Sequence, residues 1–201
     1  MRAAGPVVRI AADSGLDHAR RAGHAVDVAV GDFDSVSAEG VRWAEAEGVE
    51  LIRYDPDKDR TDFELALDLA LQRNAGEALV LGGAGGRLDH LLGNLSLLAS
   101  PRYAAMQLEA RMGDATVWVI RGERLLDVEA GTLLSLIPMH GEADAVETAG
   151  LRWPLHGERL PPGTGRGVSN VVADGPVRVS VGRGVLLADA PGSDDGVAWL
   201  S

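Results

Sequence analysis

The first half of the sequence alternates short apolar runs with segments of helical spacing, and this alternation constrains the fold more than any other feature. The apolar runs lie at 7–12, 26–30, 49–54 and 78–83, and the segments that follow them lie at 15–23, 37–48, 61–76 and 88–100. Short buried strands that alternate with helices are typical of a parallel sheet covered on both faces. We therefore expect an α/β domain over residues 1–104.

The pattern changes near Pro101, beyond which short strand-like runs are separated by turn sequences and no helical pattern is found. This spacing is typical of an all-β sandwich or barrel, and we expect a β-sandwich domain over residues 105–201. A Gly- and Pro-rich stretch at 156–167 is expected to be a long loop. The expected strands are 106–111, 115–120, 124–128, 132–137, 144–149, 168–172, 177–181 and 185–190.

Composition excludes several classes of protein. The chain has 201 residues and no cysteine, which excludes disulfides, a thiol nucleophile and thiolate-bound zinc. Its formal charge of −11 disfavours nucleic acid as a partner. No run approaches the ~20 apolar residues of a membrane span, and the N-terminal sequence does not resemble a signal peptide. We expect a cytoplasmic protein that binds neither nucleic acid nor membranes.

Polar and glycine residues follow each of the four predicted α/β strands. Ligands of open parallel sheets bind outside the carboxyl ends of the strands, so these residues are candidates for one site. Clustered carboxylates repel one another unless a cation lies among them, and Mg²⁺ prefers oxygen ligands and substrate phosphates. A glycine-rich loop before a helix binds phosphate through backbone N–H groups, with Lys58 and Arg87 as neutralising cations. The first strand is followed by Asp13 and the second by Asp32 and Asp34. The third is followed by the acid-rich segment 55–62 and the fourth by the glycine-rich segment 82–90.

These features predict metal-dependent nucleotide chemistry, with phosphoryl or pyrophosphoryl transfer as the leading class. Each single acid also has a structural explanation. Thr61 and Glu64 have the spacing of a capping box, and Asp62 is favourable in a first helical turn for electrostatic reasons alone. Asp32 and Asp34 gain nothing structural to offset their repulsion, and they are the strongest functional candidates. The glycine loop by itself matches neither common phosphate-binding motif.

Seven short motifs, taken in order, resemble those of the thiamine pyrophosphokinase family. Four lie in the first half: AADSG (11–15), VGDFDS (30–35), KDRTD (58–62) and GGRLDH (85–90). Three lie in the second half: SLIP (135–138), GLRWPL (150–155) and GVSN (167–170). The resemblance implies transfer of pyrophosphate from ATP to the hydroxyl of thiamine. It also implies a nucleotide- and Mg²⁺-binding catalytic domain, a thiamine-binding β-sandwich domain, and a homodimer with the thiamine site between subunits.

The resemblance also implies roles for individual residues. The acids that handle Mg²⁺ and phosphate would be Asp32, Asp34, Asp59 and Asp62, with Asp32, Asp34 and Asp62 as metal ligands. Asp89 would belong to the same catalytic cluster, and Asp13 would lie at its edge. The residues expected to bind ATP are Asp13, Lys58, Thr61, Gly83, Gly86, Arg87 and His90. The residues expected to bind thiamine are Ser169 and Asn170, with Trp153 as a wall of that pocket.

Two departures and two alternatives accompany the resemblance. Family members usually have a further strand and helix before the AADSG strand, and ATP binding is the property that this difference would affect. Ser14 stands where glycine is commoner in the family. One alternative is a non-catalytic relative that binds thiamine or nucleotide. The other is a glycosyltransferase that uses Asp32 and Asp34 as a metal-binding D-x-D motif.

Overall fold

The structure is a computed structural model that describes residues 7–192. Contacts within the chain divide it after Ala75 into two compact units, which are described separately. This division falls earlier than the expected domain boundary after residue 104. No helix among residues 7–192 has the length and hydropathy that a membrane span requires.

The first unit contains a three-stranded parallel sheet in the order β1-β2-β3. The strands are β1 (Ile10–Ala12), β2 (Val28–Gly31) and β3 (Glu50–Arg53), and the helices are α1 (Gly15–Arg21), α2 (Ala38–Glu47) and α3 (Asp62–Gln72). In the register, Ala11 lies opposite Ala29, and Ala29 lies opposite Leu51. Because the strands are parallel, the polar segments that follow them leave the sheet at the same edge.

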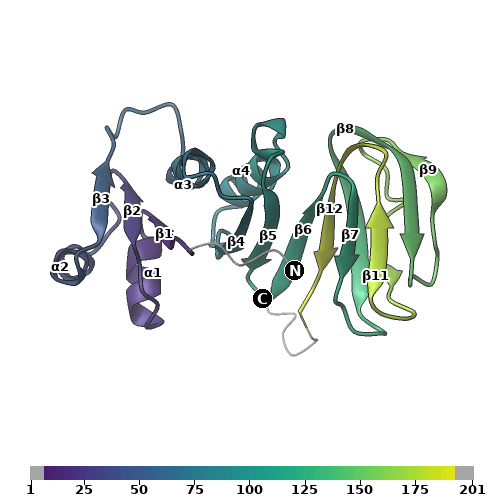
Figure 1. The fold of residues 1–201 in the computed structure, drawn as a ribbon, viewed down its shortest axis with the longest axis horizontal. Helices are drawn as coiled ribbons and strands as arrows, with labels where there is room; N and C mark the ends of the chain where they lie inside the picture. Colours follow the sequence, from purple (N-terminus) through teal and green to yellow (C-terminus); the bar gives the residue numbers. More distant parts are fainter. Residues whose placement is uncertain (1–6, 193–201) are drawn as a thin grey trace. The chain divides into compact units, whose positions relative to one another are not determined.

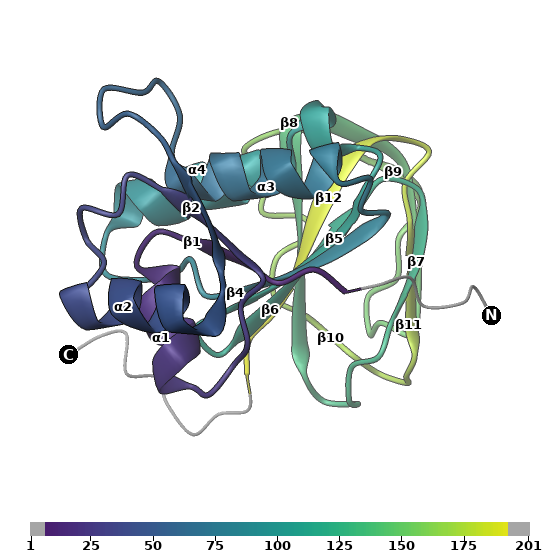
Figure 2. The ribbon, with the colours of Figure 1, turned by 60° about the vertical axis from the view of Figure 1, so that its left-hand side comes forward.

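Helices cover both faces of this sheet, as the alternation of strands and helices predicts (Figure 2). Alternate residues of β2 point to opposite faces. Ala29 packs in a cluster with Leu16 of α1 and Ala44 of α2, whereas Val28 and Val30 pack against α3. All three β2 side chains are therefore fully buried, and the sequence of this strand is apolar throughout.

Two of the helices begin at hydrogen-bonded caps. Thr61 accepts a hydrogen bond from the backbone N–H of Glu64 at 3.2 Å, which confirms the predicted start of α3. Ser37 caps α2 in the same way and also donates its hydroxyl to the buried Asp17 carboxylate at 2.7 Å. Asp17 further accepts the backbone N–H of Ser37, so α1 and α2 are joined through this carboxylate.

The second unit begins with β4 (Glu77–Leu81), α4 (Leu88–Leu98) and a short 3₁₀ turn at Pro101–Tyr103. β4 hydrogen-bonds in parallel to β5 (Gln107–Met112). The four predicted strands of the α/β part are thus divided between the two units, with β1, β2 and β3 in the first and β4 in the second. β4 is the first strand in the order of the larger sheet of the second unit, and the division of the chain falls just before it (Figure 1).

The rest of the second unit is a curled, mostly antiparallel sheet around one apolar core. It follows the order β4-β5-β6-β12-β8-β11-β7, with β9 and β10 also paired to β8. Its remaining strands are β6 (Ala115–Ile120), β7 (Glu123–Leu126), β8 (Leu133–Ala149), β9 (His156–Leu160), β10 (Asn170–Val171), β11 (Val177–Ser180) and β12 (Arg183–Ala190). The predicted order, a parallel α/β part followed by an all-β part, is confirmed.

Two expectations for the β part are wrong. The predicted strands 132–137 and 144–149 belong to one 17-residue strand, β8. Positive φ angles at His140 and Gly141 bend the chain there without ending the strand, so β8 pairs with β12 on both sides of the bend. The expected loop at 156–167 begins with β9, which pairs with the second half of β8.

Candidate functional site

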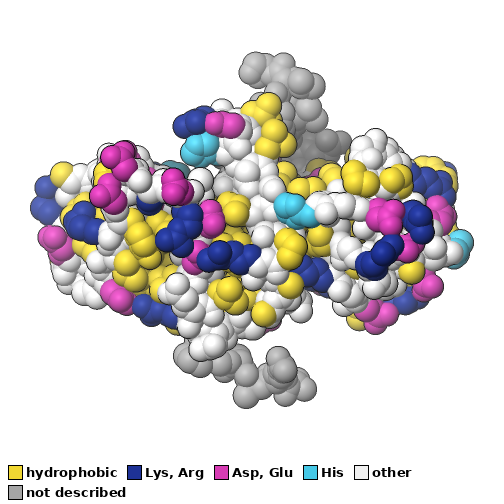
Figure 3. Space-filling model, turned by 90° about the horizontal axis from the view of Figure 1, so that it is seen from above, with side chains coloured by type: hydrophobic (Ala, Val, Ile, Leu, Met, Phe, Trp, Pro, Cys, Tyr) yellow, Lys and Arg dark blue, Asp and Glu magenta, His cyan; other side chains and the backbone are white. Residues whose placement is uncertain are grey.

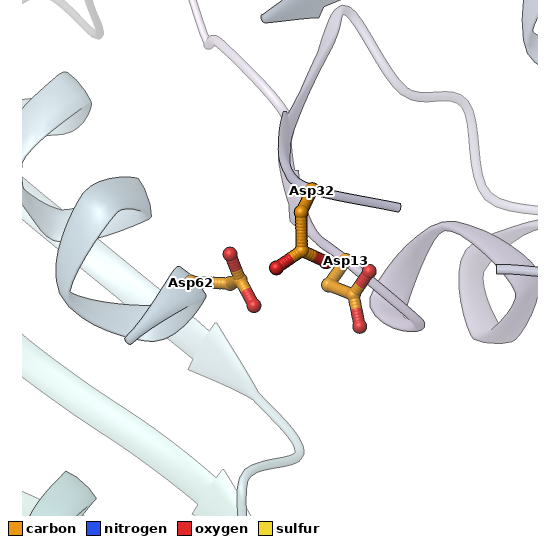
Figure 4. A group of neighbouring side chains, drawn as sticks. All are labelled: Asp13, Asp32 and Asp62. Carbon is orange, nitrogen blue, oxygen red and sulfur yellow. The ribbon is translucent and has the colours of Figure 1, made fainter. Parts of the chain in front are cut away.

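Three carboxylates from different segments meet in the first unit (Figure 4). Asp13 follows β1, Asp32 follows β2, and Asp62 is the first residue of α3. One oxygen from each carboxylate lies within 4.8 Å of the others. The backbone N–H of Asp13 donates to Val30 O at 2.9 Å, which fixes the first acid beside the end of β2. Parallel pairing of β1 and β2 thus brings Asp13 and Asp32 together.

Gly31, the last residue of β2, lies against Asp13 and Asp62 of this group. Its φ angle is +147°, a conformation that residues with a side chain rarely adopt. A Cβ atom placed there would lie 3.2 Å from Asp13 Cβ and 3.2 Å from Asp62 Oδ1. Glycine is therefore required both by the backbone conformation and by the close approach of Asp13 and Asp62.

Lys58 supplies the positive charge of the cluster. Its ammonium lies 2.6 Å from Asp32 Oδ2 and 3.2 Å from Asp62 Oδ1. Burial lowers the pKa of Lys58, but the two carboxylates outweigh that effect and hold the pKa above its usual value. The hydrogen bond from Lys58, together with one from the backbone N–H of Asp34, lowers the pKa of Asp32.

The negative charge of Asp62 is less well compensated by its neighbours than that of Asp32. Burial raises the pKa of Asp62, and the negative charges of Asp13 and Asp32 add to the rise, although Lys58 opposes it. Asp13 Oδ1 is buried without a hydrogen-bond donor, and Asp13 Oδ2 accepts the hydroxyl of Ser35. Asp62 Oδ1 is also buried, with the Lys58 ammonium 3.2 Å away as its one cationic neighbour in the cluster. Buried oxygens that lack donors are suited to a cation, and an all-carboxylate set suits Mg²⁺. The residues present therefore fit a divalent metal ion.

The other predicted residues of the first unit lie outside this group of three. Asp34 donates its backbone N–H to Asp32 Oδ1 at 3.1 Å, but its side chain is exposed. Phe33, between the two acids, is buried among apolar residues of α1 and α2, so the chain turns and the acids separate. Asp59 is also exposed, and Thr61 caps α3. The structure thus groups Asp13, rather than Asp34, with Asp32 and Asp62.

The predicted phosphate-binding loop belongs to the second unit. Gly83 and Gly86 have φ angles of +88° and +56°, and Asn94 of α4 donates its side-chain amide to Gly83 O at 3.0 Å. Arg87 forms an exposed ion pair of 2.6 Å with Asp89, which raises the pKa of Arg87 and lowers that of Asp89. His90 is exposed beside this pair.

The predicted thiamine-binding residues are arranged around β10. Trp153 is 55% exposed, and the Arg152 guanidinium lies 5.3 Å from the centre of its ring. Ser169 is exposed and has a φ angle of +58°. Asn170 is buried, and its amide binds the backbone of Trp153, accepting from the N–H at 3.1 Å and donating to the carbonyl at 2.7 Å. Its side chain therefore positions Trp153.

Several residues of these sites were not predicted from the sequence. Ser35 belongs to the VGDFDS motif and holds Asp13, and Asn94 holds the glycine loop. Asn94 lies in α4 close to Leu91, Leu92 and Leu95, and a polar residue within this leucine-rich stretch was the available signal. The net charge of −11 carried no information about the site. Acidic and basic side chains are interspersed on the face drawn in Figure 3.

Family profiles, sequence relatives and solved structures all indicate the same protein family. The profile of the thiamin pyrophosphokinase catalytic domain matches residues 5–110, and that of the thiamin pyrophosphokinase vitamin B1 binding domain matches residues 123–186. Thiamine pyrophosphokinase from Bacillus subtilis is 29% identical over 163 residues, which cover 79% of this chain and 75% of the relative. Thiamine pyrophosphokinase 1 from Oryza sativa subsp. japonica is 27% identical over 165 residues, or 77% of this chain and 62% of the relative.

Solved structures agree with the sequence matches. The crystal structure of Bacillus subtilis thiamine pyrophosphokinase superposes with a TM-score of 0.82 at 25% identity, covering 93% of this chain and 88% of that one. The Geobacillus thermodenitrificans thiamin pyrophosphokinase structure gives a TM-score of 0.79 at 28% identity, covering 96% of this chain and 90% of that one.

Proposed function

This chain belongs to the thiamin pyrophosphokinase family, and on that basis we propose that it transfers a pyrophosphoryl group from ATP to thiamine. The products are thiamine diphosphate and AMP. The observation that carries the proposal is the group of Asp13, Asp32 and Asp62, which lies within the region that matches the catalytic profile. The match of residues 123–186 to a vitamin B1 binding profile supports thiamine as the acceptor.

We propose that Asp13, Asp32 and Asp62 hold Mg²⁺, with Asp34 and Asp59 at the edge of the site. The chemistry that a bound Mg²⁺ would supply there is neutralisation of phosphate charge and orientation of the transferring group. Lys58 forms ion pairs with Asp32 and Asp62, and we propose that its ammonium also contacts a phosphate oxygen of bound ATP. Most of the catalytic effect then comes from positioning and charge neutralisation.

The reaction forms one bond and breaks one bond. The hydroxyl oxygen of thiamine attacks the β-phosphorus of ATP, the bond from that phosphorus to the α–β bridging oxygen breaks, and AMP leaves. The hydroxyl proton is released. Gly83, Gly86, Arg87 and His90 are proposed to bind the nucleotide phosphates. Arg87 would then exchange its exposed partner Asp89 for a phosphate oxygen.

The organisation of the protein follows from the same family. We propose a cytoplasmic homodimer, with the thiamine site between subunits. Residues 1–104 would serve as the catalytic domain and residues 105–201 as the thiamine-binding domain. Ser169 and Trp153 are proposed to contact thiamine. Asn170 contributes by holding the Trp153 backbone, because its own amide is already bonded to that residue.

The test is a product assay with a matched control. The protein is incubated with thiamine, ATP and MgCl₂, and AMP and thiamine diphosphate are separated by chromatography. An Asp32→Asn/Asp62→Asn variant should lose at least 99% of the activity, or about 10²-fold, as expected when transition-state charge stabilisation is removed. Glu45→Gln removes an exposed acid of α2 in the same unit and should retain full activity.

Other outcomes favour the alternatives. Tight thiamine binding without AMP release would support a non-catalytic relative. Hydrolysis of a sugar nucleotide would support a glycosyltransferase. Full activity in the double variant, with an unchanged circular dichroism spectrum, would reject the assignment of the acids.

A further inference from the structure

Asp189 is an acid in the second unit that the proposed reaction does not yet use. It lies on β12, opposite Ser135 of β8 and Val117 of β6 in the antiparallel register. Residues directly opposite in an antiparallel pair project from the same face, with Cβ atoms ~5 Å apart. Leu186 and Ala188 point into the apolar core. Because successive side chains of a strand point to opposite faces, Asp189 projects from the other face of the sheet, together with Ser135.

Ser169 lies beside Ser135 and adds a third polar residue to a row formed with Asp189 and Ser135. Its backbone N–H donates to Ser135 Oγ at 3.1 Å, and the residue that follows it, Asn170, is opposite Leu134 of β8. Asp189, Ser135 and Ser169 therefore lie side by side across β12, β8 and the start of β10. Ser169 belongs to the GVSN motif, so the row places Asp189 beside one of the proposed thiamine-binding residues.

Exposed apolar side chains border the row. Leu133 and Ile137 lie two residues before and after Ser135 on the same face of β8, and they are 46% and 40% exposed. Val168, immediately before Ser169, is 48% exposed. A polar row bordered by apolar side chains is suited to a flat ring that carries polar groups at its edge.

Asp189 is partly buried and has no hydrogen bond or ion pair with any part of residues 7–192. Burial raises the pKa of this carboxyl, and no neighbouring cation opposes the rise. A carboxylate that is partly buried and has no partner among residues 7–192 is less favourable than a paired one. A hydrogen-bond donor on a ligand would provide the missing partner.

The amide of Asn170 is not available for that donor. Its oxygen already accepts two backbone N–H groups, from Trp153 at 3.1 Å and from Val171 at 2.9 Å. Its nitrogen donates to Trp153 O at 2.7 Å. An amino group bound in this region therefore needs another acceptor, and Asp189 lies in the row that contains Ser169.

We propose that Asp189 accepts a hydrogen bond from the amino group of the pyrimidine ring of thiamine and so determines specificity for an amino-substituted ring. This inference rests on the proposed function. Ser135 and Ser169 lie beside Asp189, where their hydroxyls face the other polar atoms of the ring edge. The carboxylate has no part in the transfer step, and its contribution is to substrate recognition.

The test compares thiamine with oxythiamine, in which an oxygen replaces the amino group. Asp189→Asn should raise the KM for thiamine about tenfold, since hydrogen bonds to charged groups are strong, and leave kcat and the KM for ATP unchanged. The same variant should lower the KM for oxythiamine, because the asparagine amide donates to the ring oxygen. Asp174→Asn, which changes an exposed acid of the same unit, should alter none of these constants.

Two further measurements separate the possible failures. Thermal unfolding should show that Asp189→Asn is at least as stable as the parent, because a part-buried carboxylate is replaced by a neutral group of the same shape. If the parent makes thiamine diphosphate but Asp189→Asn has an unchanged preference for thiamine over oxythiamine, the inference is wrong and the proposed function stands. If the parent neither binds thiamine in calorimetry nor releases AMP, the proposed function and this inference both fail.

Discussion

Replacing Gly31 with alanine tests whether the acid cluster requires a residue without a side chain at this position. The backbone there has a φ angle of +147°, and holding a residue with a side chain in such a conformation costs about 1–3 kcal/mol. The new methyl group would lie 3.2 Å from both Asp13 Cβ and Asp62 Oδ1, in a fully enclosed position, and overpacking of this kind costs a further ~1–3 kcal/mol. We expect Gly31→Ala to lower the free energy of unfolding by about 2–6 kcal/mol.

Gly48 provides the matched control. It ends α2 in the left-handed conformation, with a φ angle of +72°, and a Cβ atom there would meet nothing within 4 Å. Gly48→Ala should therefore cost only the conformational part, about 1 kcal/mol. The difference between the two variants combines the greater backbone strain at Gly31 with crowding of Asp13 and Asp62 by the methyl group, and the Mg²⁺ response reports the crowding.

The assay is urea unfolding, followed by circular dichroism, with and without MgCl₂. In the parent, Mg²⁺ should raise the midpoint, because a ligand that binds only the folded state stabilises it. Gly31→Ala should lose most of this increase, since the methyl group displaces two of the three proposed ligands, whereas Gly48→Ala should retain it. Equal destabilisation by the two substitutions would refute the crowding argument. An unchanged Mg²⁺ response in Gly31→Ala would refute the geometry of the site.

Three further predictions follow from other contacts. Lys58→Met should destabilise the protein by about 1–2 kcal/mol without divalent cations, because the acids lose their counter-charge. MgCl₂ should restore more stability in the variant than in the parent. Urea unfolding without any Mg²⁺ response in either protein would contradict this prediction. Asp17→Asn should cost about 1–3 kcal/mol at pH 7, since Ser37 donates two hydrogen bonds to the carboxylate. Those bonds lower the pKa of Asp17 below its ordinary value of 3.8, so the difference from the parent should be complete above that pH and shrink as the pH falls below it; a difference that is independent of pH would exclude this origin. Asn170→Ala should raise the KM for thiamine more than it changes kcat, because Trp153 loses its backbone partner, and steady-state kinetics that show only a lower kcat would argue against a positioning role.

Local patterns in the sequence were enough to predict most of the elements. The capping box at Thr61 and Glu64 marks the start of α3, and the fully apolar β2 indicates a strand buried on both faces, because each pattern depends on neighbours along the chain. β9 was missed, since His156–Leu160 has no strand pattern and is held in the sheet by its pairing with β8. The parallel pairing of β4 with β5 was not predicted for the same reason: the sequence of β4 specifies a strand, but not its partner.

The sequence alone determined that acids gather after the strands of a parallel sheet, and its motifs identified the family. Only the tertiary structure decided which acids meet. Asp32 and Asp34 are two residues apart in the sequence but separate because Phe33 between them is buried. Asp13 and Asp62, by contrast, reach Asp32 through strand pairing and the start of α3. Asp189 and Ser135 become neighbours only through the register of β12 on β8. Contacts between segments distant in the sequence depend on how the sheets pair and pack, and local spacing carries no record of them.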